Sequence, residues 1–121
     1  HFSKPITVNA NKILMEKVFS NLIGNAVKYS PPKAIINITV QKQQSNYLFS
    51  IENYDTHIPE EAIPKLFEAF YRVDTSRSRQ TGGSGLGLYI VQKILQQHNS
   101  HCNVRNTENG VEFFFKLPQI I

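Results

Sequence analysis

Two asparagines and a lysine stand at helical spacing within residues 11–30, NKILMEKVFSNLIGNAVKYS. Asn21, Asn25 and Lys28 fall at i, i+4 and i+7, so a helix here carries all three on one face, in line with apolar residues of the preceding turns. Polar groups on a largely buried stripe are costly unless a partner satisfies them. Carboxamide oxygens suit a hard cation that keeps several waters, and a lysine suits a phosphate. The face therefore indicates either a magnesium nucleotide site or asparagines that cross-link a core.

A glycine-rich segment, GGSGLGL at 82–88, comes directly before another stretch with helical spacing. Free backbone N–H groups at a helix start favour an anion, and glycines let the backbone approach phosphate oxygens closely. The segment is not a P-loop, because no Gly-Lys-Ser/Thr ends it, and it does not match the GxGxxG dinucleotide fingerprint. Such a turn is often only a flexible joint, but Arg77 and Arg79 in the preceding loop make it a candidate for binding phosphates.

The elements that position these residues follow from apolar periodicity and from turn signals. Three segments are predicted to be helical: 11–30, 58–70 and 86–97. Five segments are predicted to be strands: 5–8, 34–42, 47–53 and the two arms of a hairpin within 102–118 that turns at Asn109 and Gly110. This order predicts an α+β fold, a two-layer α/β sandwich in which a mixed sheet of about five strands packs against three helices. Residues 71–85 are expected to form a mobile lid.

Length and composition limit the possible functions. With 121 residues, 40% of them apolar and 18% charged, the chain is expected to be one globular domain spanning 1–121. The net charge of +4 favours an anionic partner, whether a nucleotide, a nucleic acid or an acidic protein. The single cysteine, Cys102, excludes an internal disulfide, and no apolar run approaches the roughly 18 residues of a membrane span. The start at His1 indicates a segment excised from a longer protein.

Three motifs occur in one order: NLIGNAVKYS on the first helix, FEAFYRVD at the end of the second, and GGSGLGLYIV at the third. Together, over nearly the whole chain, they resemble the catalytic ATP-binding domain of bacterial sensor histidine kinases, of the Bergerat or GHKL type, and more narrowly the vancomycin-response kinases. The resemblance implies an α/β sandwich that holds Mg²⁺ and ATP between its helices and a lid. It also implies transfer of the γ-phosphoryl to a histidine on a separate dimerisation helix.

The first motif assigns roles to four residues of the long helix. Asn21 and Asn25 match the asparagines that reach Mg²⁺ and phosphate oxygens in these kinases. Lys28 matches a phosphate-binding lysine, and Tyr29 matches the aromatic residue beside the nucleotide sugar and phosphates. On the resemblance, this helix is therefore one wall of the nucleotide site.

The lid and the segments on either side of it carry further matches. Arg72 matches an arginine directed at the phosphates and joins Asn21 and Lys28 as a predicted catalytic residue. Three glycines and a leucine belong to the box that closes over the triphosphate: Gly83, Gly85, Leu86 and Gly87. Two aromatics match the F-box, either as core side chains or as part of lid movement: Phe67 and Phe70.

The chain departs from the family pattern at the adenine site, which reads Asp-x-Gly-x-Gly before Ile-Pro and is aligned here on Ile58. Asn53 then replaces the acid, and Asp55 and His57 replace the two glycines. An asparagine oxygen can still accept from the adenine amino group, but without charge assistance, and its NH₂ can satisfy another base. Asp55 has the same strand parity as Asn53 and is the alternative base contact. Because a Cβ at either glycine position can narrow the site, we expect weaker or less adenine-selective binding.

Asn21 also bears on the type of reaction. Hydrolytic relatives resembling gyrase and MutL carry a glutamate at this place, where it activates water, and an asparagine cannot act as that base. Transfer to an outside nucleophile is therefore favoured over hydrolysis, and Glu16, one turn earlier, is expected to be an exposed surface residue. Four histidines lack the acid and proline context of the family's phosphoacceptor: His1, His57, His98 and His101. The fragment should bind nucleotide without phosphorylating itself.

Two other functions stay open at this point. A degenerate, non-catalytic kinase-like module, which binds nucleotide weakly and docks on a partner, is favoured by the altered adenine motif. A nucleic-acid binder is motivated by the basic charge and the SRSR run, but no recognisable aromatic stacking pattern accompanies them, so no nucleic-acid partner is expected. The resemblance to kinases implies two partners, the phosphoacceptor helices of the same kinase and a response regulator. It also implies a monomeric cytoplasmic domain, without direct membrane contact, of a membrane-anchored sensor.

Overall fold

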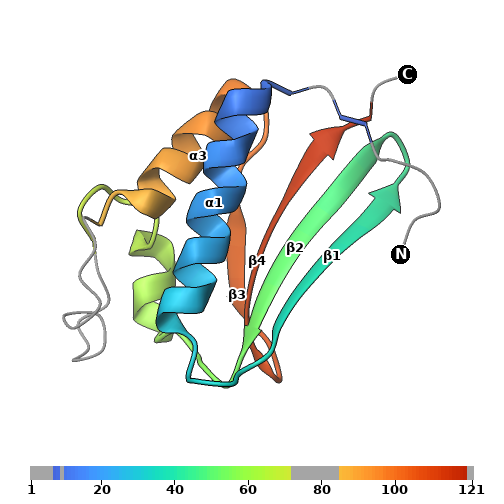
Figure 1. Ribbon diagram of the computed structural model, residues 1–121. Helices are drawn as coiled ribbons and strands as arrows, with labels where there is room; N and C mark the ends of the chain where they lie inside the picture. The colour runs from blue at the N-terminus through green and yellow to red at the C-terminus, as the bar shows by residue number, and fades with distance from the viewer. Residues whose placement is uncertain (1–6, 9, 72–84, 120–121) are drawn as a thin grey trace.

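Two helices cover one face of an antiparallel sheet in the computed structural model, which describes residues 7–8, 10–71 and 85–119 (Figure 1). The described elements are, in order, α1 (Lys12–Tyr29), β1 (Ile36–Gln43), β2 (Asn46–Tyr54), the 3₁₀ helix η1 (Glu60–Lys65), α3 (Gly87–Gln97), β3 (Asn103–Asn106) and β4 (Gly110–Pro118). The α+β class and the two layers agree with the sequence prediction. None of the helices in these ranges is long and apolar enough to cross a lipid bilayer.

The asparagine face predicted from the sequence lies on α1, the long helix. Its N-cap is Asn11, whose Oδ1 accepts a hydrogen bond from the backbone N–H of Leu14 at 3.0 Å. The backbone N–H of Asn11 donates to Nε2 of His98 at 3.0 Å, which joins the start of α1 to the end of α3. The helix ends at Tyr29, shortly before Pro31, because a proline cannot continue the helical hydrogen bonding.

The four described strands lie in the order β1-β2-β4-β3, and each neighbouring pair is antiparallel. The sheet therefore differs from the predicted mixed sheet of about five strands. Of the segment 5–8, the described part makes only an isolated bridge between Val8 and Gln119. The relative direction of β2 and β4 could not follow from periodicity, because helices separate them along the chain and no hairpin turn fixes their pairing.

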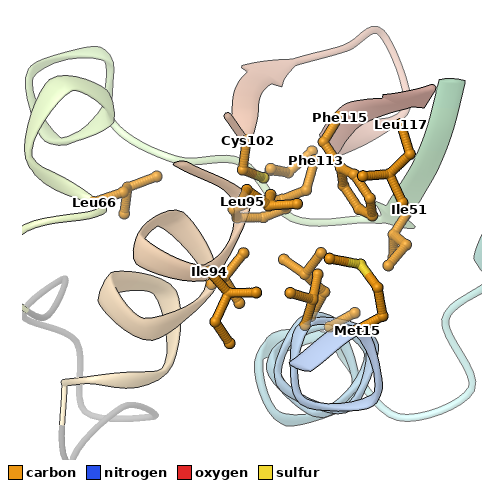
Figure 2. Close-up of a cluster of buried hydrophobic side chains, with 14 residues drawn as sticks. Met15, Ile51, Leu66, Ile94, Leu95, Cys102, Phe113, Phe115 and Leu117 are labelled. Atoms are coloured by element: carbon orange, nitrogen blue, oxygen red, sulfur yellow. The ribbon is translucent and has the colours of Figure 1, made fainter. Parts of the chain in front are cut away.

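The core lies between the two layers, where the inward side chains of the sheet meet one face of each helix (Figure 2). Met15 of α1 and Leu95 of α3 belong to the same buried cluster as Phe113 and Phe115 of β4. The ring of Phe115 stacks on that of Phe49 with 5.3 Å between centroids and 15° between planes. Every second residue of β4 from 111 to 117 is buried, as expected for a strand with one face on a core. The sheet is thereby fixed against both helices.

Cys102 is part of this core rather than of a reactive or metal-binding site. Its backbone is held by the carboxamide of Gln92, which accepts from Cys102 N–H at 2.7 Å and donates to Cys102 O at 3.0 Å. Burial raises the pKa of the Cys102 thiol to about 12, and a hydrogen bond with the backbone of Phe114 only partly opposes the shift. The thiol therefore stays protonated, and unreactive, at neutral pH.

The predicted helix over 58–70 is wrong in type and in length. The structure has the short 3₁₀ helix η1, with turns from its end to Phe70. Pro64 lies inside η1, where it lacks an N–H to donate and disfavours the α conformation of the preceding residue. η1 begins at Glu60, two residues after the predicted start, with Pro59 as its N-cap and two glutamates in its first turn. A short 3₁₀ helix accommodates the second proline, whereas a longer α-helix does not.

Candidate functional site

The structure brings Asn21, the first residue of the asparagine face of α1, against the glycine-rich start of α3. Asn21, Asn25 and Lys28 all lie on α1 and are half-buried. A Cβ placed on Gly87, the first residue of α3, would lie 3.3 Å from Oδ1 of Asn21. The carboxamide of Asn21 therefore abuts the N-terminus of α3, so two motifs that are far apart in the sequence meet here. The helices that carry them, α1 and α3, lie side by side (Figure 1).

This junction has the donors and acceptors that a magnesium triphosphate requires. The first turn of α3 presents backbone N–H groups that have no partner within the helix, and its dipole favours negative charge. Carboxamide oxygens of Asn21 and Asn25 are hard ligands for Mg²⁺, and Lys28 supplies a positive charge one turn further along α1. Tyr29, the last residue of α1, directly follows Lys28 in the sequence and is half-buried. The residues present thus fit Mg²⁺ and phosphates.

The two ends of the predicted lid meet at its base. The backbone N–H of Phe70 donates to the carbonyl of Gly85 at 2.8 Å. Both residues have positive φ, 67° for Phe70 and 76° for Gly85, and a Cβ on Gly85 would lie 2.8 Å from the Cα of Phe70. Gly85 is therefore required by both conformation and space. The predicted lid residues Arg72 and Gly83 lie outside the described residues, as do Arg77 and Arg79.

The two F-box aromatics occupy different environments. Phe67 packs edge-to-face on Phe113, with ring centroids 6.4 Å apart, and so belongs to the rim of the core. Phe70 is 71% exposed and adopts a positive φ that is unusual for a bulky residue. The predicted role as a core aromatic thus fits Phe67, whereas Phe70 lies beside the lid base at Gly85.

At the other end of the site, Asn53 of β2 has a buried oxygen without a partner. The residue is only 4% exposed, and its Oδ1 has no hydrogen bond within the described protein. Its directly paired neighbours on β1 and β4 are Ile36 and Val111, which offer no hydrogen-bond donor in their side chains. A buried acceptor left unpaired costs on the order of 1–3 kcal/mol, so the position fits an acceptor reserved for a ligand's N–H.

The two residues at the family's glycine positions follow Asn53 and face outward. Asp55 is exposed and has φ 63°, a left-handed conformation that glycine adopts freely and that aspartate tolerates. Its backbone N–H donates to the carbonyl of Asn109 at 2.9 Å. His57 is also exposed, and its Nε2 lies 3.1 Å from the carbonyl of Thr107. Strand parity therefore misleads here, because β2 ends at Tyr54 and Asp55 no longer points the way Asn53 does.

Two residues lie near Asn53, at the end of the site proposed for the base, which we call the base end. Sequence reasoning gave one of them a different role and did not single out the other. Gly110 was predicted to serve a tight Asn-Gly turn, but it begins β4, and a Cβ there would lie 2.0 Å from the carbonyl oxygen of Asn53. It is needed because two strands approach closely. Asn106 was not singled out, yet its carboxamide hydrogen-bonds the N–H and the C=O of Ile58. A lone asparagine near a hairpin turn gives no signal of such a role.

Comparisons with known proteins agree with this arrangement. The family described as histidine kinase-, DNA gyrase B- and HSP90-like ATPase matches residues 10–121. The sensor protein VanSB of Enterococcus faecalis is 42% identical over 105 residues, which are 87% of this chain and 24% of that protein. The phosphate regulon sensor protein PhoR of Haemophilus influenzae is 41% identical over 115 residues, 94% of this chain and 27% of that protein.

Solved structures show the same fold. The catalytic domain of the histidine kinase ThkA, in a nucleotide-free form, has a TM-score of 0.80 and 33% identity over 93% of this chain and 70% of that one. The chain spans about a quarter of the length of VanSB and PhoR. The family match covers nearly all of the chain, and the relatives named above are sensor kinases. The chain therefore belongs to the family of histidine kinase-, DNA gyrase B- and HSP90-like ATPases, as an ATP-binding domain of the kind found in sensor histidine kinases.

Proposed function

We propose that this domain binds Mg-ATP and transfers the γ-phosphoryl group to a histidine on a separate dimerisation domain of the same kinase, in two-component signal transduction. The observation that carries the proposal is the contact between the Asn21 carboxamide and the start of α3, with Asn25 and Lys28 on the same face of α1. The unpaired oxygen of Asn53 supports a base at the other end. The domain is proposed to work as a cytoplasmic, monomeric unit of a membrane-anchored sensor.

The chain's own residues have the roles that phosphoryl transfer needs, which are positioning and neutralisation of charge. Asn21 and Asn25 would hold Mg²⁺, which would supply positive charge to offset that of the triphosphate. Lys28 and the helix N-terminus at Gly87 orient the phosphates, and Arg72 of the lid adds a further positive charge. The asparagine face carries no carboxylate or imidazole, the groups that most often serve as general bases. Transfer to a nucleophile supplied from outside follows from this set.

The hydrogen bonds of His98 make it unsuited as the phosphoacceptor. His98 donates from Nδ1 to the carbonyl of Ile94 at 2.8 Å and accepts the N–H of Asn11 at Nε2, so both ring nitrogens are engaged. His57 makes a hydrogen bond with the carbonyl of Thr107. ThkA has been solved in complex with the response regulator TrrA at 30% identity to this chain and a TM-score of 0.76. By analogy, we propose that a response regulator then receives the phosphoryl group from the acceptor histidine.

The direct test is calorimetric titration with Mg-ATP of wild type beside Asn21→Ala and Asn53→Ala. Both variants should bind at least about tenfold more weakly, because each removes a polar group from one end of the nucleotide. Asn37→Ala, an exposed asparagine on β1, is the matched control and should bind as wild type. Labelled ATP should then phosphorylate an added dimerisation domain and leave this domain unlabelled. A wild type that does not bind Mg-ATP would refute the proposal.

The alternative function, a non-catalytic docking module, rests only on the sequence, which has an aspartate and a histidine at the family's glycine positions. Transfer assays separate the two functions, since a docking module binds nucleotide but leaves the dimerisation domain unlabelled.

Base selectivity tests the base end of the site. Asn53→Asp should raise the preference for ATP over GTP by about tenfold, because a carboxylate accepts from the adenine amino group with charge assistance and offers guanine no donor. Competition titrations with ATP and GTP measure this preference. An unchanged ratio would contradict the assignment of Asn53 to the base.

A further inference from the structure

We propose that Asn106 is a positioning residue for the nucleotide base, because it holds Ile58 in place and so fixes the loop 54–60 beside Asn53. The inference rests on the proposed nucleotide-binding function and adds to it a residue outside the three kinase motifs. It assigns the β3–β4 turn a part in base selectivity. The turn contributes through hydrogen bonds to the loop rather than through contact with the nucleotide.

The carboxamide of Asn106 makes hydrogen bonds to both the backbone N–H and the backbone C=O of Ile58. Its Oδ1 accepts from the N–H of Ile58 at 2.8 Å, and its Nδ2 donates to the C=O of Ile58 at 2.7 Å. The second Nδ2 hydrogen reaches Oε1 of Glu60 at 3.1 Å. The pair of bonds to Ile58 replaces the pair that a neighbouring strand would make. The backbone of Ile58, in a loop, is thus held as the backbone of a strand residue is, although its partner is a side chain.

The register of the sheet explains why this grip bears on the base. Asn53 pairs with Val111, and Val111 pairs with Asn106, so the three residues form one row on the helix-facing side of β2, β4 and β3. Adjacent strands lie about 4.8 Å apart, which puts the two asparagines about 10 Å apart, with β4 between them. β2 ends at Tyr54, one residue after Asn53, and four residues later the backbone of Ile58 is hydrogen-bonded to Asn106. Asn106 therefore sets where Ile58 lies relative to the unpaired oxygen of Asn53.

The turn that presents Asn106 is itself fixed. Oγ1 of Thr107 donates to Oε2 of Glu52 at 2.5 Å and accepts from the N–H of Gly110 at 2.9 Å. The N–H of Thr107 donates to the carbonyl of Gly110 at 2.7 Å. His57, inside the loop, makes a hydrogen bond with the carbonyl of Thr107. A rigid turn can hold a loop in one conformation, which is what discrimination between bases requires.

A carboxamide also makes two hydrogen bonds to one residue's backbone just before β3, at the end of that strand away from Asn106. Gln92 of α3 makes the two equivalent hydrogen bonds to the backbone of Cys102, in the connection to β3. Removing it deletes the same two bonds without touching the loop after β2. Gln92→Ala is therefore a matched control for Asn106→Ala, since both lose a carboxamide that holds one peptide residue.

The experiment measures affinity for Mg-ATP and for Mg-UTP in wild type, Asn106→Ala and Gln92→Ala, by competition with a fluorescent ATP analogue. Both nucleotides share the triphosphate, so their affinity ratio isolates the base. Asn106→Ala should lower ATP affinity about tenfold and UTP affinity less than about twofold, so that the ratio falls. Gln92→Ala should leave the ratio of ATP to UTP affinity as in wild type. Thermal unfolding should show that Asn106→Ala and Gln92→Ala are both destabilised.

Each outcome decides the question. An unchanged ratio in Asn106→Ala, an equal fall in Gln92→Ala, or a wild type without preference for ATP over UTP overturns this inference and leaves the proposed function intact. A wild type that binds neither nucleotide overturns the proposed function as well. If Asn106→Ala does not fold, amide hydrogen exchange of the wild-type protein is measured in place of the affinities of the variant. ATP should then slow exchange of the Ile58 N–H more than UTP does, and equal protection overturns the proposal.

Discussion

The phosphate end and the base end of the candidate site are built in opposite ways. At the phosphate end, the half-buried side chain of Asn21 on α1 lies against Gly87 at the start of α3, and this contact involves the flexible end of a side chain. At the base end, Asn53 is 4% exposed, and the loop after it is hydrogen-bonded to the β3–β4 turn at several points.

The difference follows from what each end has to recognise. Phosphates carry charge, which lysine, metal and helix N–H groups attract over some distance and from several directions. A base is neutral and is recognised only by desolvated donors and acceptors at fixed positions. We therefore expect Gly110→Ala at the base end to damage the fold, and Gly87→Ala at the phosphate end to damage binding alone.

The largest expected effect is that of Gly110→Ala at the base end. The added Cβ would meet the carbonyl oxygen of Asn53 at 2.0 Å, so β4 and β2 must separate. The free energy of unfolding should fall by about 3 kcal/mol or more. Urea denaturation followed by circular dichroism measures the loss. A fall below about 1 kcal/mol would show that this end can adjust, and the contrast between the two ends would weaken.

The two F-box aromatics give the next largest difference. Phe67→Ala removes an edge-to-face contact with Phe113 on the core and should cost about 2 kcal/mol of unfolding free energy. Phe70→Ala, beside the lid base and 71% exposed, should change stability by less than about 0.5 kcal/mol. Thermal or urea unfolding of the two variants in parallel tests this. Equal losses would mean that the lid base is part of the core.

Gly87→Ala tests the phosphate end. Its Cβ would lie 3.3 Å from Oδ1 of Asn21, which can move aside at small cost to the fold but leaves its place against α3. Mg-ATP should bind about tenfold more weakly, with stability nearly unchanged. Gly24→Ala on α1 is the control, because nothing lies within 4 Å of its Cβ. It should bind as wild type and gain up to about 1 kcal/mol of stability.

The smallest expected effect is that of Asp55→Gly. Glycine adopts the φ of 63° at this position without strain, which favours the folded state, but it adds freedom to the unfolded chain. The net gain in unfolding free energy should be below about 1 kcal/mol. Base selectivity should not change, since Asp55 is exposed and Asn53 is buried. A shift in the ratio of ATP to GTP affinity would reassign part of base recognition to Asp55.

The sequence alone determined the parts that depend on local spacing. The face of Asn21, Asn25 and Lys28 follows from helical periodicity, and the end of α1 follows from Pro31. The strands of the β1–β2 and β3–β4 hairpins were found because alternation and turn residues are local. The α+β fold was predicted for the same reason. The helix predicted over 58–70 is wrong because Pro64 lies inside it and favours a short 3₁₀ helix.

Only the tertiary structure decided which distant residues meet. The antiparallel direction of β2 and β4, the contact of Asn21 with Gly87, and the grip of Asn106 on Ile58 all join segments that no hairpin links. The same is true of Gly110. The Asn-Gly dipeptide indicated a turn, but glycine is required there because the backbone of Asn53 on β2 lies too close for a Cβ. Periodicity reports which face of an element is buried, but partners and close approaches are set by packing between elements, which spacing along one chain does not contain.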